Sequence, residues 1–281
     1  MSSEPEDDGF EPNDIINRAQ HFKGSMKKYW NQRYDIFEKY DNGILLTKEL
    51  WFSVTPESIS KFTAKFINAA FKGKNGPVKI MDAFCGGGGN IVQFLMYSDI
   101  VYAADINKLH LHCTFNNCMV YIDKPTLDEK LKLLPLDWTV VDHFKDWQHF
   151  DQSSLDADTY ATIAESMTNI QTFQNGEFDC IFGSPPWGGP DYINQKTFDL
   201  DNLLPFTLEK LLRILSRFTG QIALFLPKNS DLEQLKAITE RVFGSGSVVR
   251  VLRMSIQGRA KGLLVCWGKE FDNVDLVDIR L

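Results

Sequence analysis

The tract 184–190, which reads Ser-Pro-Pro-Trp-Gly-Gly-Pro, holds residues whose types and spacing could do chemistry. It follows the apolar run 178–183, which has the composition of a buried strand. The two prolines restrict the backbone, and Trp187 adds a large flat ring directly after them. The Ser184 hydroxyl and the Pro185 carbonyl could accept hydrogen bonds from an amine. This arrangement favours a site that holds a planar nucleobase while its exocyclic amine reacts.

Two structural alternatives compete with this interpretation. A pair of prolines also makes a plain rigid turn, and Trp187 could be a core ring. The glycines that follow Trp187 favour an exposed ring that stacks on a base. An amine conjugated to a purine is a poor nucleophile, so its alignment with the group that it attacks should supply much of the catalysis. If that group is itself strongly activated, little help from a general base is needed.

A second candidate site is the tract 82–90, which reads Asp-Ala-Phe-Cys-Gly-Gly-Gly-Gly-Asn. Glycines there let the backbone approach a ligand closely and adopt positive φ. Their spacing differs from the G-x-G-x-x-G pattern that places a pyrophosphate at a helix start. Asp82 would repel a phosphate, but it would pair well with an ammonium or a sulfonium group. The tract therefore favours S-adenosylmethionine over NAD.

Acids at the ends of the next two expected strands extend this donor site. Asp105 is predicted to accept hydrogen bonds from both ribose hydroxyls, and Asp142 is predicted to meet the adenine amine. Each signal is weak alone, because a glycine turn is often structural and an acid at a strand end is often a helix cap. Their joint order favours a nucleoside ligand.

Strands and helices alternate along most of the chain. Strands are expected at 78–84, 100–105, 138–142, 178–183 and 221–226, and helices at 89–97, 107–121, 201–218 and 230–243. This alternation predicts an α/β fold, a mainly parallel doubly wound sheet with helices on both faces. Two further strands, 247–256 and 261–267, predict a C-terminal antiparallel hairpin. The polar, weakly periodic segment 145–176 is interpreted as a surface insertion.

The domain boundaries follow from composition. Residues 1–14 are predicted to be a disordered acidic tail, and residues 15–52 a small helical extension that contributes to the site. A methyltransferase domain is expected over 53–271, followed by a tail at 272–281. Its first helix is predicted to have Thr55 as N-cap and Pro56 as first helical residue.

Charge and composition narrow the choice of ligands. The net charge is −7, but six acids lie in the first 14 residues, whereas residues 18–39 carry six basic residues and two acids. This local basic patch fits a small phosphate-bearing ligand better than a long duplex, although a solvated helix face explains it equally well. Five cysteines without a C-x-x-C pair predict neither a zinc cluster nor a disulfide framework. No stretch is long and apolar enough to span a membrane.

Four tracts in order resemble the trimethylguanosine synthase family, and the resemblance covers about residues 28–267. They are Lys-Tyr-Trp-Asn-Gln-Arg-Tyr at 28–34, Trp-Phe-Ser-Val-Thr-Pro-Glu at 51–57, Asp-Ala-Phe-Cys-Gly at 82–86 and Ser-Pro-Pro-Trp-Gly-Gly-Pro-Asp-Tyr at 184–192. The resemblance implies a class I Rossmann-like methyltransferase fold. It also implies transfer of two methyl groups from S-adenosylmethionine to the exocyclic N2 of a 7-methylguanosine RNA cap, with no metal.

The resemblance also implies roles for individual residues. The donor pocket would be lined by Phe37, Ser53, Thr55, Asp82, Asn90 and Asp105. Trp187 would stack on the methylated guanine, with Ser184 and Pro185 near the reacting amine and Asn117 and Tyr192 beside the cap. Lys28 and Lys228 would meet the triphosphate. Some family members carry Arg at the position of Lys228, and lysine lacks the bidentate geometry of arginine.

The expected partners are capped small nuclear and small nucleolar RNAs, together with core proteins of their ribonucleoproteins. Residence in the nucleus, and there in the nucleolus, follows from the family. Two alternatives stay open at this point. The chain could methylate a base amine in tRNA, rRNA or DNA, or it could be a cap-binding module without activity.

Overall fold

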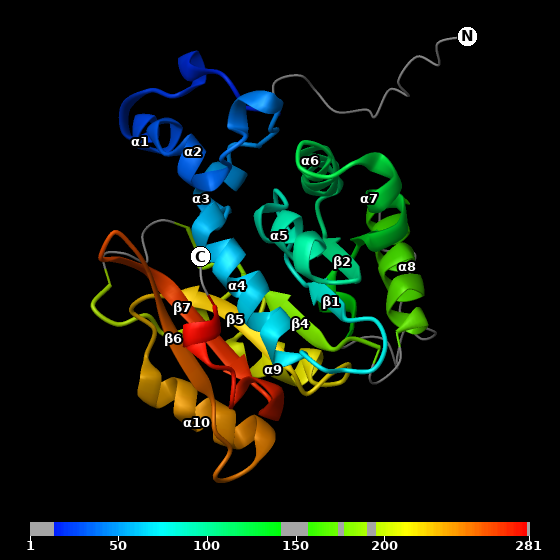
Figure 1. The fold of residues 1–281 in the computed structure, drawn as a ribbon, viewed down its shortest axis with the longest axis vertical. Helices are drawn as coiled ribbons and strands as arrows, with labels where there is room; N and C mark the ends of the chain where they lie inside the picture. Colours follow the sequence, from blue (N-terminus) through cyan, green and yellow to red (C-terminus); the bar gives the residue numbers. More distant parts are fainter. Residues whose placement is uncertain (1–13, 142–156, 174–176, 190–194, 280–281) are drawn as a thin grey trace.

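The computed structural model describes residues 14–141, 157–173, 177–189 and 195–279. Its centre is a seven-stranded sheet in the order β3-β2-β1-β4-β5-β7-β6 (Figure 1). The strands are β1 (Lys79–Asp82), β2 (Ile100–Asp105), β3 (Leu131–Pro135), β4 (Cys180–Gly183), β5 (Ile222–Pro227), β6 (Arg250–Ile256) and β7 (Arg259–Trp267). The first five strands run parallel, and β7 is antiparallel to both β5 and β6. The predicted mainly parallel sheet with a C-terminal antiparallel hairpin is confirmed.

Helices cover both faces of the sheet, so its central strands are apolar on both sides. In β5, Ala223 and Phe225 pack into one core cluster, while Ile222 and Leu224 pack into the other. Helices on the first face are α4 (Glu57–Ala70), α5 (Gly89–Tyr97), α6 (Lys108–Met119) and α7 (Lys124–Lys130). Those on the second are α8 (Ala157–Thr172), α9 (Leu208–Leu215) and α10 (Leu232–Phe243). The doubly wound α/β architecture is therefore confirmed.

Local chemistry sets several of these boundaries. Asn107 caps α6, Asp123 caps α7, and Asp231 caps α10 through side-chain oxygens that accept from first-turn backbone N–H groups. The hairpin turn between β6 and β7 consists of Gln257 and Gly258, which both have positive φ, as tight two-residue hairpins require. The helix expected over 201–218 is shorter, because only Leu208–Leu215 is α-helical.

The third strand lies earlier than expected. The β-branched residues near 140 predicted a strand over 138–142, but β3 is Leu131–Pro135, directly after α7. Pairing with β2 decides this, because Val101 aligns with Leu131 at the start of the ladder. Residues Trp138–Val141 form a 3-10 helix instead, and Asp142 lies outside the described residues.

The segment 145–176 is not merely a surface insertion. It contains α8, whose Met167 and Ile170 are buried in the core of the second face. Asn169 of α8 donates a hydrogen bond to the Pro135 carbonyl at the end of β3 (3.0 Å). This helix therefore lies on the path from β3 to β4, the crossover that two parallel strands need. Residues 142–156 and 174–176 lie outside the described part of the chain.

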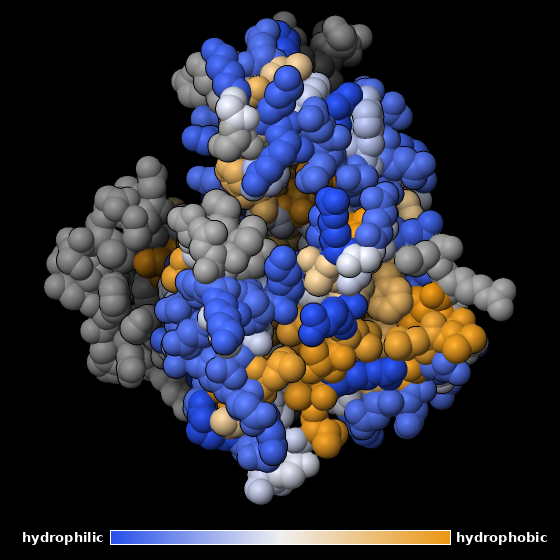
Figure 2. All heavy atoms as spheres, turned by 90° about the vertical axis from the view of Figure 1, so that its left-hand side faces the viewer, coloured by the Kyte–Doolittle hydropathy of each residue, from blue (hydrophilic) through white to orange (hydrophobic). Residues whose placement is uncertain are grey.

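The N-terminal extension consists of short helices at the top of Figure 1. These helices surround an aromatic cluster. The helices are α1 (Lys27–Asn31), α2 (Arg33–Ile36) and α3 (Leu50–Ser53). Phe22, Trp30, Tyr40 and Trp51 pack together, with ring centroids 4.6 Å apart for Phe22 and Trp51. The exposed surface of this region is largely hydrophilic (Figure 2). The predicted disordered tail falls at residues 1–13, which are not described, and at Asp14. Within the described ranges, no helix combines the length and apolar character needed to cross a membrane.

Candidate active site

The carboxyl ends of the parallel strands bring the candidate residues to one edge of the sheet. Asp82, the last residue of β1, aligns with Ala103 of β2 and Phe182 of β4. Asp105 and Ser184 each lie two residues beyond these partners. Lys228 directly follows β5, the next strand along. Ligands of doubly wound sheets bind at this edge, and the register therefore places an acid-lined site beside the Ser-Pro-Pro-Trp tract.

The glycine turn after β1 is tightly constrained. Gly86 and Gly88 have φ of +53° and +80°, and a Cβ atom at Gly88 would lie 3.1 Å from the Thr114 Cα of α6. The Gly86 N–H donates to Asp105 Oδ2 (3.0 Å). Only glycine avoids both the backbone strain and the close approach at position 88. The turn thus presents its backbone at the start of α5.

The N-terminal extension packs against the outside of this turn. A Cβ atom at Gly87 would lie 2.9 Å from Leu46 Cδ2, and one at Gly89 would lie 2.9 Å from Val54 Cγ1. Glu57, in the first turn of α4, accepts hydrogen bonds from the Glu38 backbone N–H (2.6 Å) and from the side chains of Gln93 and Tyr121. Residues 37–57 are therefore docked on the turn that a donor would touch.

Asp82 carries an unusual charge environment. Its side chain is fully buried, and burial raises the pKa of its carboxyl to about 7, with a further contribution from Asp105. The Phe84 backbone N–H donates to Asp82 Oδ1 (3.1 Å) and partly opposes this rise in pKa. No described residue donates a hydrogen bond to Asp82 Oδ2, although that oxygen is buried. A buried polar atom without a partner and with a strongly shifted pKa marks a candidate ligand-binding group.

S-adenosylmethionine fits these groups. The buried Oδ1 of Asn90, like Asp82 Oδ2, has no hydrogen-bond partner among the described residues. Both atoms are acceptors, and the ammonium, the ribose hydroxyls and the adenine amine of the donor molecule are hydrogen-bond donors. Cations and neutral donors suit such a site, whereas a pyrophosphate does not. Among the described residues, no group of three or more His, Cys, Asp or Glu side chains could hold a metal ion.

The acceptor tract lies directly after β4. Trp187 is half-buried and its ring packs at 5.6 Å from Phe225 of β5, with the two planes tilted by 43°. The Pro186 carbonyl accepts from the Leu204 N–H (3.0 Å), which fixes the turn. No described residue donates to the Pro185 carbonyl or to the half-buried Ser184 hydroxyl. Both oxygens are therefore available to orient an amine.

Comparison with known proteins identifies the family. A family model for RNA cap guanine-N2 methyltransferases matches residues 78–270. The chain is 34% identical over 254 residues to the trimethylguanosine synthase of Saccharomyces cerevisiae, covering 90% of this chain and 70% of that protein. It is 30% identical over 213 residues to the trimethylguanosine synthase of Schizosaccharomyces pombe, covering 76% and 75% respectively. This chain belongs to the RNA cap guanine-N2 methyltransferase family.

A solved structure shows the same fold at much lower identity. The crystal structure of a protein assigned as a methyltransferase, from Porphyromonas gingivalis W83, has a TM-score of 0.54 and 12% identity. The match covers 89% of this chain and 51% of that chain. The cap methyltransferase therefore has the class I methyltransferase architecture that its sequence predicted.

One prediction about this region needs correction, and another stays a prediction. Asn117, predicted beside the cap, is fully buried, and its amide makes hydrogen bonds within the protein. Its Nδ2 donates to the carbonyls of Leu45 and Gly87, and its Oδ1 accepts from the Leu45 N–H (2.8 Å). Asn117 thus ties the extension to the glycine turn. Thr55 was expected as the N-cap of α4, but Pro56 occupies that position.

The remaining predicted residues are placed as follows. The Thr55 hydroxyl accepts from Asn90 Nδ2 (3.3 Å), which brings both residues to the donor side. Phe37 is buried, and a Cβ atom at Gly89 would lie 4.0 Å from its ring. Ser53 is exposed and its hydroxyl donates to the Glu49 carbonyl. Lys28 and Lys228 are exposed. Asp142 and Tyr192 lie outside the described residues.

Three further residues support the site, although the sequence analysis assigned them no role. Trp138 Nε1 donates to the Ala83 carbonyl (2.8 Å), directly after Asp82. Glu57 holds the extension, and His110 contacts Asp105. An indole just beyond the third strand and a histidine in the first helical turn after Asp105 were the available signals.

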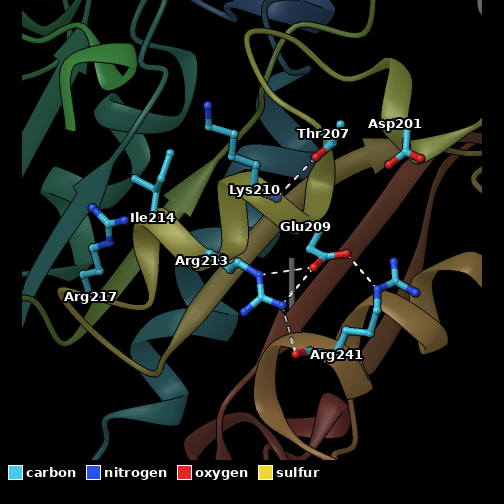
Figure 3. A pocket seen from close by; sticks show the side chains of 8 residues that line it. All are labelled: Asp201, Thr207, Glu209, Lys210, Arg213, Ile214, Arg217 and Arg241. Atoms are coloured by element: carbon cyan, nitrogen blue, oxygen red, sulfur yellow. Dashed lines mark hydrogen bonds and ion pairs between the residues drawn. The ribbon is translucent and has the colours of Figure 1, made fainter. Parts of the chain in front are cut away.

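A separate hollow lies between α9 and α10 (Figure 3). It has a volume of about 430 Å³ and is lined by basic and acidic side chains. Glu209 pairs there with Arg213 (2.8 Å) and Arg241 (2.7 Å), as the dashed lines in Figure 3 show. These contacts clamp the two helices together. The hollow is therefore explained by packing on the second face of the sheet.

Proposed function

We propose that this chain methylates the exocyclic N2 of a 7-methylguanosine RNA cap twice and yields 2,2,7-trimethylguanosine. One observation carries the site assignment. The sheet register places Asp82, whose buried Oδ2 has no hydrogen-bond partner among the described residues, beside β4, the strand that directly precedes Ser184. A donor held by Asp82 and an amine held by the Ser184 tract would therefore meet at one edge.

The donor side would be built from acceptors. We assign the ammonium of S-adenosylmethionine to Asp82 and a ribose hydroxyl to Asp105, while Asn90, Thr55 and Phe37 complete the pocket. S-adenosylmethionine, when bound, supplies an activated methyl group on its sulfonium. The buried, ionised Asp82 would also attract a cation strongly, because little solvent screens it.

The acceptor side would orient rather than activate. Ser184 and the Pro185 carbonyl would accept hydrogen bonds from the guanine amine and so direct its lone pair. Trp187 would stack on the base, and the positive charge of 7-methylguanine adds a cation–π attraction of about 0.5–2 kcal/mol. Lys28 and Lys228 would contact the cap triphosphate. Much of the rate enhancement would then come from alignment.

Product analysis tests the reaction. The full chain is incubated with S-adenosylmethionine and a 7-methylguanosine cap dinucleotide, and the products are separated by chromatography. We expect N2-monomethylated and then N2-dimethylated cap. Uncapped RNA should stay unmodified. Methylation of uncapped RNA or DNA, or no methylation of the dinucleotide, would contradict the proposal.

Replacing Trp187 tests the stacking role. Stacking of a base on an aromatic ring is worth about 1–3 kcal/mol, so Trp187→Ala should lower kcat/KM for the cap dinucleotide about 10- to 100-fold. Trp187→Phe should keep part of the activity. Calorimetry should show donor affinity within about two-fold of the wild type. Tyr160→Ala, on α8 of the second face, is the matched aromatic control. Full activity in Trp187→Ala would exclude a stacking role.

We further propose that the natural substrates are small nuclear and small nucleolar RNAs. The sequence tracts that resemble the trimethylguanosine synthase family support this assignment. Core proteins of the corresponding ribonucleoproteins would be the protein partners, and the nucleus, with its nucleolus, would be the site of action. Imaging of the tagged full chain, and sequencing of capped RNAs that co-purify with it, would test these points. A cytoplasmic signal with only messenger RNA bound would contradict them.

A further inference from the structure

A histidine lies between the ribose-binding candidate and the N-terminal extension. His110 is in the first turn of α6, where its backbone N–H is accepted by the capping Asn107 side chain (3.4 Å). Its side chain is only 14% exposed. The contact with the helix-capping Asn107 and the burial of the side chain together leave the imidazole little freedom to move.

Each ring nitrogen of His110 faces a different partner. Nδ1 lies 3.4 Å from Asp105 Oδ1. Nε2 lies 3.4 Å from the Thr47 hydroxyl and 3.6 Å from Glu49 Oε2. A neutral ring with its proton on Nδ1 can donate to Asp105 and accept from the Thr47 hydroxyl. The Glu49 carboxylate is 79% exposed, so solvent screens its contact.

Asp105 is held on two other sides as well. Its Oδ2 accepts from the Gly86 N–H (3.0 Å), and its Oδ1 accepts from the Asn107 N–H (2.9 Å). A carboxylate offers about four lone-pair sites. With the His110 contact, three of these sites are used and about one, on Oδ2, remains to accept from a ribose hydroxyl. The plane of the carboxyl group is set by groups from three directions.

The far side of His110 belongs to the segment that covers the glycine turn. Thr47 is buried, and its hydroxyl also accepts from the Leu50 N–H (3.4 Å) at the start of α3. The neighbouring Leu46 and Leu50 approach Gly87 and Gly86. His110 therefore connects two parts of the donor pocket that are far apart in sequence.

We propose that His110 is a positioning residue for the methyl donor, and that it acts by holding Asp105 in the orientation that accepts a ribose hydroxyl. This inference rests on the ribose role proposed for Asp105. The second contact, with Thr47, keeps the ring in place from the side of the extension.

The test compares two ligands that differ only at the ribose. S-adenosylhomocysteine and its 2′-deoxy analogue are titrated by calorimetry against the full chain. A hydrogen bond to a charged acceptor makes the wild type prefer the ribose ligand by about ten-fold or more. In His110→Ala this preference should fall to about two- or three-fold. A role in packing alone would weaken both ligands equally and leave their ratio unchanged.

Conservative variants separate the two halves of the contact. His110→Asn places an amide donor near the position of Nδ1 and should restore most of the ribose preference. His110→Gln reaches toward Thr47 without a donor at Nδ1, and it should behave like His110→Ala. His112→Ala, on the same helix, is the matched control and should keep the wild-type preference. Melting curves verify that each variant is folded, and His110→Gln serves if the alanine variant is not.

The outcomes distinguish this inference from the proposed donor site. If Asp105→Asn keeps the full ribose preference, the ribose role of Asp105 is wrong and the inference falls with it. If Asp105→Asn loses the preference while His110→Ala and His110→Gln keep it, only the positioning role is overturned. Loss of the ribose preference in both Asp105→Asn and His110→Ala, with recovery of the preference in His110→Asn, supports the positioning role of His110.

Discussion

At the scale of single residues, Asp82 combines a structural cost with a proposed role in binding the donor. A carboxyl buried beside Asp105 is destabilised in its ionised form, so its pKa rises to about 7. A bound cation would reverse that penalty. The same burial that opposes ionisation in the free protein would therefore strengthen the attraction for a cationic donor once the carboxyl is ionised.

The first prediction concerns Asp82→Asn. Burial raises the pKa of the folded carboxyl from its ordinary value of 3.8 to about 7, so the folded state binds the proton more tightly. Its contribution to stability is full below about pH 4 and is lost as the pH rises through 7, a change on the order of 4 kcal/mol. Asparagine cannot ionise, so the stability of the free variant relative to the wild type should rise between about pH 4 and pH 7 and stay level above that.

Urea unfolding followed by circular dichroism measures this difference. Asp128→Asn, an exposed acid on α7, is the control and should shift stability by less than about 0.5 kcal/mol. Asp82→Asn should also bind S-adenosylmethionine more weakly than the wild type at pH 8, because the carboxylate at position 82 is gone. Parallel stability curves for wild type and Asp82→Asn would show that the carboxyl is not the source of the pH dependence.

At the scale of elements, the glycine turn is held from two directions. Thr114 of α6 approaches Gly88 from one side, and Leu46 and Val54 of the extension approach its neighbours from the other. The Thr114 hydroxyl also donates to the Gly86 carbonyl (2.7 Å). The extension is thus part of the wall of the proposed donor site, although it precedes the sheet in sequence.

The second prediction separates crowding from backbone strain at this turn. Gly88→Ala meets the Thr114 Cα at 3.1 Å and also carries an unfavourable φ of +80°. Gly246→Ala has nearly the same φ, +81°, but meets nothing within 4 Å. The control should cost about 1–2 kcal/mol of unfolding free energy from strain alone, and Gly88→Ala should cost more and weaken donor binding at least ten-fold. Equal losses in the two variants would show that the turn has room to relax.

At the scale of the whole molecule, the net charge of the chain and the charge of the proposed cap-phosphate contacts have opposite signs. The chain carries −7 overall, whereas Lys28 and Lys228 are the proposed contacts for the cap phosphates. Salt screens both the repulsion between the net negative charge and the cap phosphates and the attraction between the two lysines and those phosphates. The direction in which KM changes with salt therefore reports which of them dominates.

The third prediction follows from that contrast. Local attraction should dominate, so KM for the cap dinucleotide should rise several-fold between about 50 and 300 mM salt. Lys228→Gln should raise KM at low salt and flatten the dependence, with kcat little changed. Lys236→Gln, an exposed lysine on α10, is the control. A KM that falls with added salt would show that repulsion by the whole molecule prevails.

Much of the fold was predictable because its signals are local. The helix predicted over 89–97 matches α5 in both bounds, since a glycine turn and an apolar run mark it without any distant contact. The strand over 100–105 matches β2 in the same way. The strand near 140 failed, because Thr-Val-Val has local strand propensity but β2 pairs with Leu131–Pro135 instead.

The sequence by itself determined the alternation of strands and helices, the acid at the end of β1 and the Ser-Pro-Pro-Trp tract, because residue types and short spacings encode them. Only the tertiary structure decided that Asn117 supports the glycine turn, that Thr55 meets Asn90 and that His110 faces Asp105. The first two contacts join residues about 30 positions apart, and the third depends on how α6 is rotated against the sheet. Chain crossings and side-chain packing set such pairs, and neither can be read from a local pattern.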